Sequence, residues 1–232
     1  MRLDKLLANK AVGSRKEVHQ IIRDGRVTVN GAVILKKDQS IHIDDDIIAV
    51  DGVQISTKQQ YYIKFHKPAG YITAVEDPTH PVVMDLLPPE FKKMGVFPVG
   101  RLDKDTEGLL LLTNDGIWAH SIINGHKHVP KVYYVEFNGK LTKEGIERIE
   151  TGIVLGDRTQ CKPANIDVLS EQSLHITIEE GKYHQVKRMI WAAGGEVTYL
   201  KRLSIGHITL DGIEAINTYS EIGDQDVVDF KK

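Results

Sequence analysis

Hydrophobic positions near the N-terminus predict two short helices. Leucines at three of the first seven positions, followed by Ala11, recur at helical spacing. Ser14 stands three positions before Glu17, which is the capping-box signature of a helix start. We therefore expect a second helix over Arg15–Arg23.

Short alternating segments follow these helices and predict a small sheet. Arg26–Asn30 alternates in hydropathy, and the pair Asn30-Gly31 favours a tight hairpin into Ala32–Leu35. Ile41–Ile43 and Ile47–Val50 have the same alternation and are two further candidate strands. The first part of the chain is thus expected to hold two helices and a small sheet.

The polar stretch Ser56–Gln60 is typical of a linker, so we expect two domains, residues 1–58 and 59–232. Beyond the linker, strands and helices do not alternate strictly. This favours an α+β fold, with a mixed, mostly antiparallel sheet and flanking helices, over a doubly wound sheet. The expected strands are Tyr61–Phe65, Val96–Val99, Leu109–Leu112, Lys131–Phe137, Ala164–Leu169, Leu174–Ile178, Val197–Leu203 and His207–Leu210. The expected helices are Gly116–Ile123, Lys143–Ile149 and His184–Ala193.

Composition excludes several classes of protein. The chain is 41% hydrophobic and 27% charged, as globular proteins are. Its one cysteine, Cys161, cannot form an internal disulfide, and no leader or apolar run of membrane-spanning length is present. We expect a cytoplasmic protein without a membrane partner. Nothing suggests a large exposed apolar stripe, so we expect a monomer.

The sequence predicts neither a metal site nor a cofactor. It has no CxxC pair and no glycine-rich phosphate loop. His120, His126 and His128 lie close together along the chain, but no fourth ligand is evident. Histidines that face solvent or RNA are the better interpretation of this group.

Charge is distributed unevenly, although the net charge is only -2. Residues 1–37 hold nine basic residues against three acids, and residues 182–202 hold five against one. A clustered basic surface is typical of nucleic-acid binding. The candidate RNA-binding residues are Arg15, Lys16, Arg23, Arg26, Lys182 and Arg188.

Three acids at alternate positions, Asp103, Asp105 and Glu107, precede the apolar run Leu109–Leu112. Their spacing matches the opening of a calcium-binding EF-hand loop. That interpretation fails because Asn114 stands where a bidentate glutamate is needed, and because the leucines require burial. Two other kinds of chemistry remain open.

A pair of carboxylates could perform acid and base catalysis, as in a glycosidase-like hydrolase, if their environments separated their pKa values. Alternatively, Asp103 could act alone as a reactive carboxylate beside a cation. Asp105 and Glu107 would then have loop and surface roles. The candidate cations are Arg101, Lys182, Lys187 and Arg188.

Four segments, in order, resemble the RsuA-type branch of RNA pseudouridine synthases. GRLDKDTEGLLLLTNDG, residues 100–116, resembles the signature that carries the catalytic aspartate. KVY, residues 131–133, and EGKYHQVKRM, residues 180–189, resemble the family's tyrosine and basic motifs. The N-terminal RLDKLL, GSRKE and GRVTVNG are similar to an S4 RNA-binding domain, which this branch carries. Together the matches span nearly the whole chain.

The resemblance implies a role for each matching residue. Asp103 would be the catalytic acid, Tyr133 the ring that stacks on the target uracil, and Lys187 the cation paired with Asp103. Arg101 would help to displace the flipped base. Many members of the wider superfamily have arginine at the Lys187 position, and lysine lacks its bidentate fork, so Arg188 is a second candidate for the pairing.

The implied function is isomerisation of one uridine in ribosomal RNA to pseudouridine, by base flipping, glycosidic cleavage and C5–C1′ rejoining. Small-subunit 16S RNA, naked or in a partly assembled subunit, is the expected partner. The alternatives are a large-subunit pseudouridine synthase and a noncatalytic S4-containing RNA-binding or ribosome-assembly protein.

Overall fold

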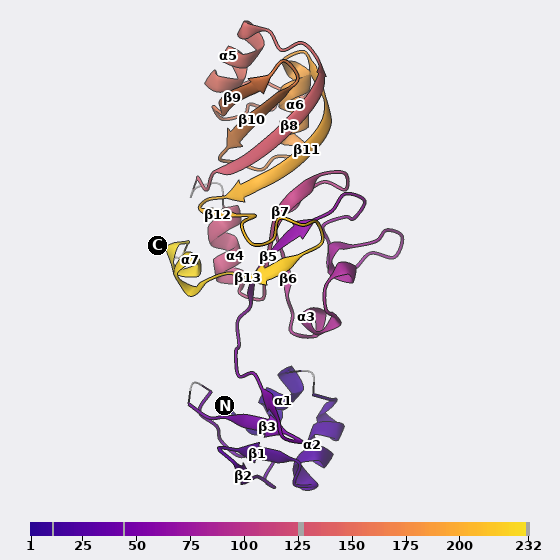
Figure 1. The fold of residues 1–232 in the computed structure, drawn as a ribbon, viewed down its shortest axis with the longest axis vertical. Helices are drawn as coiled ribbons and strands as arrows, with labels where there is room; N and C mark the ends of the chain where they lie inside the picture. The colour runs from indigo at the N-terminus through magenta and orange to yellow at the C-terminus, as the bar shows by residue number, and fades with distance from the viewer. Residues whose placement is uncertain (11, 44, 125–127, 231–232) are drawn as a thin grey trace. The chain divides into compact units, whose positions relative to one another are not determined.

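The computed structural model describes residues 1–10, 12–43, 45–124 and 128–230. Ala11 and His126, which figured in the predictions, lie outside these residues. The chain divides into two compact units, Met1–Tyr61 with Leu87–Val96, and Tyr62–Leu86 with Phe97–Lys232 (Figure 1). The predicted boundary between the RNA-binding and catalytic domains, at residues 58 and 59, stays a prediction.

The first unit consists mainly of two helices packed on a small antiparallel sheet. The helices are α1 (Leu3–Asn9) and α2 (Arg15–Arg23), and the short α3 (Pro89–Lys93) also belongs to this unit. The strands, in the order β2-β1-β3-β4, are β1 (Val27–Val29), β2 (Ala32–Val33), β3 (Ile48–Val50) and β4 (Val53–Ile55). Leucines and isoleucines from both layers form its core.

The predicted capping box is present. The backbone N–H of Ser14 donates to the Glu17 carboxylate at 2.7 Å, and the N–H of Glu17 donates to Ser14 Oγ at 3.4 Å. These bonds satisfy N–H groups that the first turn of a helix leaves unpaired. The helix α2 accordingly begins and ends at the predicted residues.

The strand predicted at Ile41–Ile43 was wrong. Ile41 is buried and its N–H donates to the Met1 carbonyl at 2.8 Å, but the chain then turns, and the His42 N–H donates to the Asp46 carboxylate. The alternation therefore reflected one buried side chain rather than a strand. A hairpin at Asp51 and Gly52, both with positive φ, instead pairs β3 with the unpredicted β4.

The second unit contains one sheet of nine strands within the described residues. Seven follow the order β13-β5-β7-β11-β8-β10-β9, while β6 pairs with β7 and β12 with β11. The strands are β5 (Tyr62–Lys67), β6 (Phe97–Val99), β7 (Glu107–Thr113), β8 (Lys131–Gly139), β9 (Asn165–Ser170), β10 (Ser173–Ile178), β11 (Gly195–Ile205), β12 (Ile208–Thr209) and β13 (Tyr219–Glu221).

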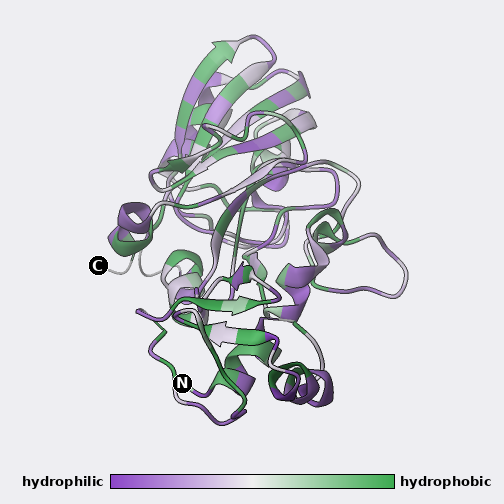
Figure 2. Cartoon of the chain, turned by 60° about the horizontal axis from the view of Figure 1, so that its bottom comes forward, coloured by the Kyte–Doolittle hydropathy of each residue, from purple (hydrophilic) through white to green (hydrophobic). Residues whose placement is uncertain are grey.

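Helices flank this sheet, as predicted. They are α4 (Gly116–Ile123), α5 (Lys143–Thr151), α6 (Gln185–Ala192) and α7 (Asp224–Asp229), with a 3-10 turn, η1, at Val83–Leu86. In Figure 2 the sheet alternates between hydrophobic and hydrophilic residues, and β10 alternates between buried and partly exposed positions. The predicted α+β class with a mixed, mostly antiparallel sheet is confirmed. Within the described residues, no helix is long and apolar enough to span a membrane.

One parallel strand pair organises the centre of the sheet. β7 pairs in parallel with β11, and all the other pairs between described strands are antiparallel. Gly108, with φ at 106°, lies so close to β11 that a Cβ would be 2.2 Å from the Arg202 carbonyl oxygen. Only glycine fits this approach. The four leucines that follow it, Leu109–Leu112, are fully buried and fix the end of the preceding acidic loop.

Candidate active site

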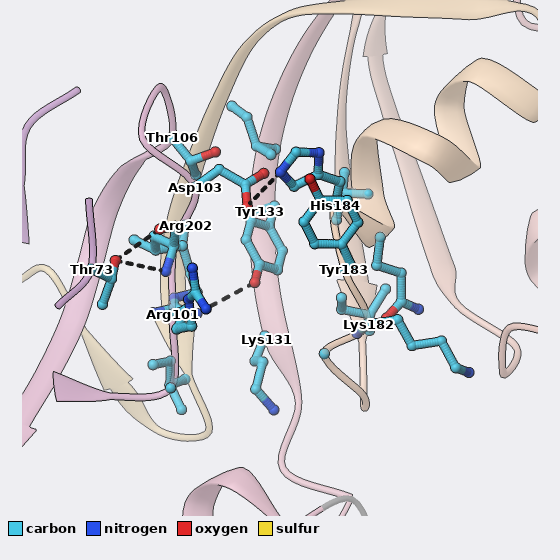
Figure 3. Close-up of a pocket in the computed structure, with 18 of the residues that line it drawn as sticks. Thr73, Arg101, Asp103, Thr106, Lys131, Tyr133, Lys182, Tyr183, His184 and Arg202 are labelled. Carbon is cyan, nitrogen blue, oxygen red and sulfur yellow. Dashed lines mark hydrogen bonds and ion pairs between the residues drawn. The ribbon is translucent and has the colours of Figure 1, made fainter. Parts of the chain in front are cut away.

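A cavity of about 620 Å³ lies where three distant segments meet (Figure 3). The loop Gly100–Lys104 forms one wall, the turn Gly181–Gln185 forms another, and Lys131 and Tyr133 of β8 lie between them. The volume is typical of sites that enclose small ligands. The structure therefore brings segments from three of the resembling motifs to one place.

Asp103 and Lys187, predicted to pair, lie together. Lys187 Nζ, from the first turns of α6, is 3.2 Å from Asp103 Oδ2. Nε2 of His184 is 3.5 Å from the other carboxylate oxygen. The Asp103 side chain is 26% exposed, so it can meet a ligand in the cavity.

Lys187 also binds a second carboxylate, that of Asp105, at 2.5 Å. Burial raises the pKa of Asp105, but the hydrogen bond and charge of Lys187 outweigh it, so the pKa lies below its usual value. Burial lowers the pKa of Lys187, and its bonds to both carboxylates raise it overall. Asp105 is a loop residue, as expected, yet it shares this cation with Asp103.

The other predicted acid and the alternative cations have partners elsewhere. Glu107 accepts a hydrogen bond from the Tyr199 hydroxyl at 2.7 Å. Arg188 pairs with Asp157 at 2.5 Å, so it is not the cation at Asp103. Lys182 pairs with Glu180 at 2.5 Å.

Tyr133 lies on β8 directly opposite Arg202 of β11, and both side chains are buried. Arg202 donates from Nε to the Leu109 carbonyl at 2.7 Å and from Nη1 to the Tyr133 hydroxyl at 3.4 Å. This arginine holds the tyrosine at the edge of the cavity. Because it is buried, Arg202 does not belong to any exposed basic surface that the other basic residues of 182–202 form.

The loop that carries Asp103 is fastened by Thr73. Its hydroxyl donates to the Leu102 carbonyl at 2.8 Å and accepts from the Leu102 N–H at 3.1 Å. Arg101, one residue earlier, lines the cavity and is exposed. The backbone of this loop is therefore fixed, and Arg101 is a cation that a ligand entering the cavity can reach.

Lys67 is a fully buried cation beneath the same loop. Its ammonium donates to the carbonyls of Thr106 at 2.8 Å, Pro68 at 3.0 Å and Asp103 at 3.1 Å, with a fourth, that of Lys104, at 3.4 Å. Sequence reasoning missed it. Only its position in the motif Lys67-Pro68, at the end of β5, could have indicated a structural role.

Catalytic activity at this cavity is expected to fall as the pH rises through about 8, because Lys67 and Lys131 then lose their positive charge. Burial lowers the pKa of Lys67 to about 8, and the same cause lowers that of Lys131 to about 8. A lysine in the unfolded chain has a pKa of about 10.4, so near pH 8 the unfolded state keeps protons that the folded state loses. Deprotonation of these two lysines should therefore not lower the free energy of unfolding in this pH range. A profile of kcat/KM, with urea unfolding at each pH, checks this. If Lys131→Met shows the same fall in kcat/KM at alkaline pH, the fall is assigned to Lys67.

The predicted RNA-binding residues of the first unit are Arg15, Lys16, Arg23 and Arg26. All are exposed, on α2 and just before β1. The Arg26 guanidinium forms two hydrogen bonds with the Asp51 carboxylate. The other three leave their positive charge available to solvent.

Among the described residues, no group of three histidine, cysteine, aspartate or glutamate side chains is placed to hold a metal ion. His128 lies 3.0 Å from a Glu179 carboxylate oxygen.

Comparison with known proteins gives two family matches. A family model described as RNA pseudouridylate synthase matches residues 61–192, and the S4 domain model matches residues 1–47. The uncharacterised RNA pseudouridine synthase YtzG of Bacillus subtilis is 43% identical, over 98% of this chain and 97% of its own. Ribosomal small subunit pseudouridine synthase A of Escherichia coli is 36% identical over 98% of both chains. A crystal structure of a pseudouridylate synthase has a TM-score of 0.68 at 29% identity and covers 99% of both.

Proposed function

We propose that this chain, which belongs to the RNA pseudouridylate synthase family, isomerises one uridine of small-subunit ribosomal RNA to pseudouridine. The observation that carries the proposal is the Asp103–Lys187 pair in a cavity bounded by Tyr133. The name of the relative from Escherichia coli, which covers nearly the whole chain, supports the choice of the small subunit.

The geometry supports a role for each residue. A uridine must leave its stack before its glycosidic bond can be reached. The flipped uracil would stack on Tyr133, and Arg101 would occupy the place that the base leaves. Asp103, paired with Lys187, would promote cleavage of the N1–C1′ bond. The uracil would turn within the cavity, C5 would join C1′, and the C5 proton would be lost as N1 gains one.

Mapping of pseudouridine in RNA from cells with and without the gene tests the target. We expect one pseudouridine of 16S RNA to disappear. Loss confined to large-subunit RNA would contradict the choice of substrate. Treating naked 16S RNA and partly assembled small subunits with the purified protein shows which of them is modified.

We also propose that residues 1–58 act as an S4 anchor for RNA, and that the protein works in the cytoplasm as a monomer. The match of residues 1–47 to the S4 model and the exposed cations on α2 support the anchor.

Replacing Arg15, Lys16 and Arg23 together with glutamine should weaken RNA binding and flatten its dependence on salt. Each lost phosphate contact lowers the slope of log K against log salt by about 0.7 to 0.9. Fluorescence titration at several salt concentrations measures the slope. The matched control changes three exposed cations of the second unit, Lys140, Lys143 and Arg158, to glutamine and should keep the wild-type slope. An equal slope in the anchor variant and the wild-type protein would contradict the proposed anchor.

A further inference from the structure

Tyr183 is an exposed aromatic residue that the proposed mechanism does not use. It lines the cavity, yet 76% of its surface is exposed. Its ring is stacked on that of His184, with centroids 3.9 Å apart and planes at 17°. Because His184 covers one face of the tyrosine, the opposite face is the one available to a ligand.

The turn that carries this ring pair is held rigidly. His184 has a left-handed backbone, with φ at 46°, which is uncommon outside glycine. The Lys182 N–H donates to the Gln185 side chain at 2.9 Å, and the Gln185 N–H donates back to the Lys182 carbonyl at 3.2 Å. Residues held in such conformations cluster at binding sites, where the surrounding structure fixes them.

Arg188 adds a further tie. It donates to the Tyr183 carbonyl at 3.3 Å and is itself held by Asp157 at 2.5 Å. The exposed ring therefore stands on a fixed backbone. A ligand that stacks on it loses little binding free energy to ordering of the turn.

The ring pair lies directly beside the reaction centre. His184 is 3.5 Å from Asp103, and Tyr183 is the next ring outward. In Figure 3, Tyr183 and Lys182 lie on one side of Tyr133, while Arg101, Thr73 and Arg202 lie on the other. A strand of RNA whose uracil reaches Tyr133 would place a neighbouring nucleotide within reach of this wall.

We propose that the outer face of Tyr183 is a stacking site for a nucleobase adjacent to the target uridine in single-stranded RNA. The inference rests on the proposed function and extends it to a second nucleotide. An aromatic ring can stack on any of the four bases, since each has a π-face. The site thus contributes affinity and register along the strand without reading base identity.

The test combines protein variants with RNA that lacks single bases. The probe is a synthetic fragment of 16S RNA containing the uridine found by mapping, or, without one, the 16S fragment that the wild-type protein binds most tightly. Further copies carry an abasic ribose at one position each. Dissociation constants are measured for the wild-type protein, Tyr183→Ala and Tyr183→Phe. Loss of one stacked base is expected to weaken binding about tenfold.

Tyr183→Ala should bind intact RNA about tenfold more weakly, and Tyr183→Phe should bind it as the wild-type protein does. For one abasic position next to the target, Tyr183→Ala and the wild-type protein should bind equally. Trp191→Ala, at an aromatic residue that is 70% exposed but does not line the cavity, is the control and should leave the effect of that abasic position unchanged.

Three outcomes would overturn the stacking site. The first is a loss in Tyr183→Ala that is the same for every RNA, and the second is an equal loss in Tyr183→Phe. The third is coupling only at the target uridine, which would mean that Tyr183 contacts the reacting base instead. Binding and pseudouridine formation are separate readouts, so failure of this site is distinguishable from failure of the proposed function, which would appear as no pseudouridine formed by the wild-type protein.

Discussion

Asp103→Asn is expected to abolish pseudouridine formation, with a loss of at least about 10³-fold in kcat, while RNA affinity stays close to that of the wild-type protein. The amide has the shape of the carboxylate but lacks its charge and nucleophilicity. Lys187 keeps its bond to Asp105 in this variant, so the cavity should retain its structure. Quantifying pseudouridine in treated 16S RNA, alongside a binding titration, measures both quantities.

Glu107→Gln is the matched control, since it makes the same chemical change four residues away. Glu107 accepts a hydrogen bond from Tyr199, and a glutamine oxygen can still accept it, so activity should persist. A severe loss in Glu107→Gln, with release of free uracil, would favour the hydrolase with two carboxylates. Full turnover by Asp103→Asn would remove Asp103 from the mechanism. RNA binding without any pseudouridine formed by the wild-type protein would favour a noncatalytic RNA-binding protein.

Lys67→Met is expected to destabilise the protein by about 3 kcal/mol or more, because loss of a buried cation leaves its partners without a donor. Those partners are carbonyls of the loop that carries Asp103, together with that of Pro68. The loop should lose its fixed position, so pseudouridine formation should fall as well. Urea unfolding gives the free energy, and the RNA assay gives the activity.

Lys64→Met, on the same strand, tests whether burial is the cause. Its ammonium donates to one exposed carbonyl, that of Asp211, so the substitution should cost less than about 1 kcal/mol. If both variants lose the same free energy of unfolding, the four carbonyls around Lys67 do not account for the effect of its substitution.

Elements with local signals could be predicted from sequence. The capping box placed α2 at its observed bounds, and the helix expected over Gly116–Ile123 is α4, whose N-cap is Asp115. Short elements that depend on distant partners could not be predicted. The strand β13 forms only because Tyr219–Glu221 meets β5. Ile41 is buried although it belongs to no strand.

The same distinction holds for the candidate site. Asp103, Tyr133 and Lys187 were reached through the resemblance of their motifs, and the structure brings them to one cavity. Arg202 was missed because its burial follows from the register of β8 on β11. Lys67 was missed because only the folded loop gathers four carbonyls around one strand residue.

Asp103 is the one carboxylate among the described residues that line the cavity, whereas five cationic side chains line it: Arg101, Lys104, Lys131, Lys182 and Arg202. The negative charge of Asp103 is thus surrounded by positive charge, to which Lys187 adds. Cations in a cleft raise the local concentration of a negatively charged ligand. The walls of the cavity therefore favour the approach of a phosphate-bearing strand toward a carboxylate that would repel it if it stood alone.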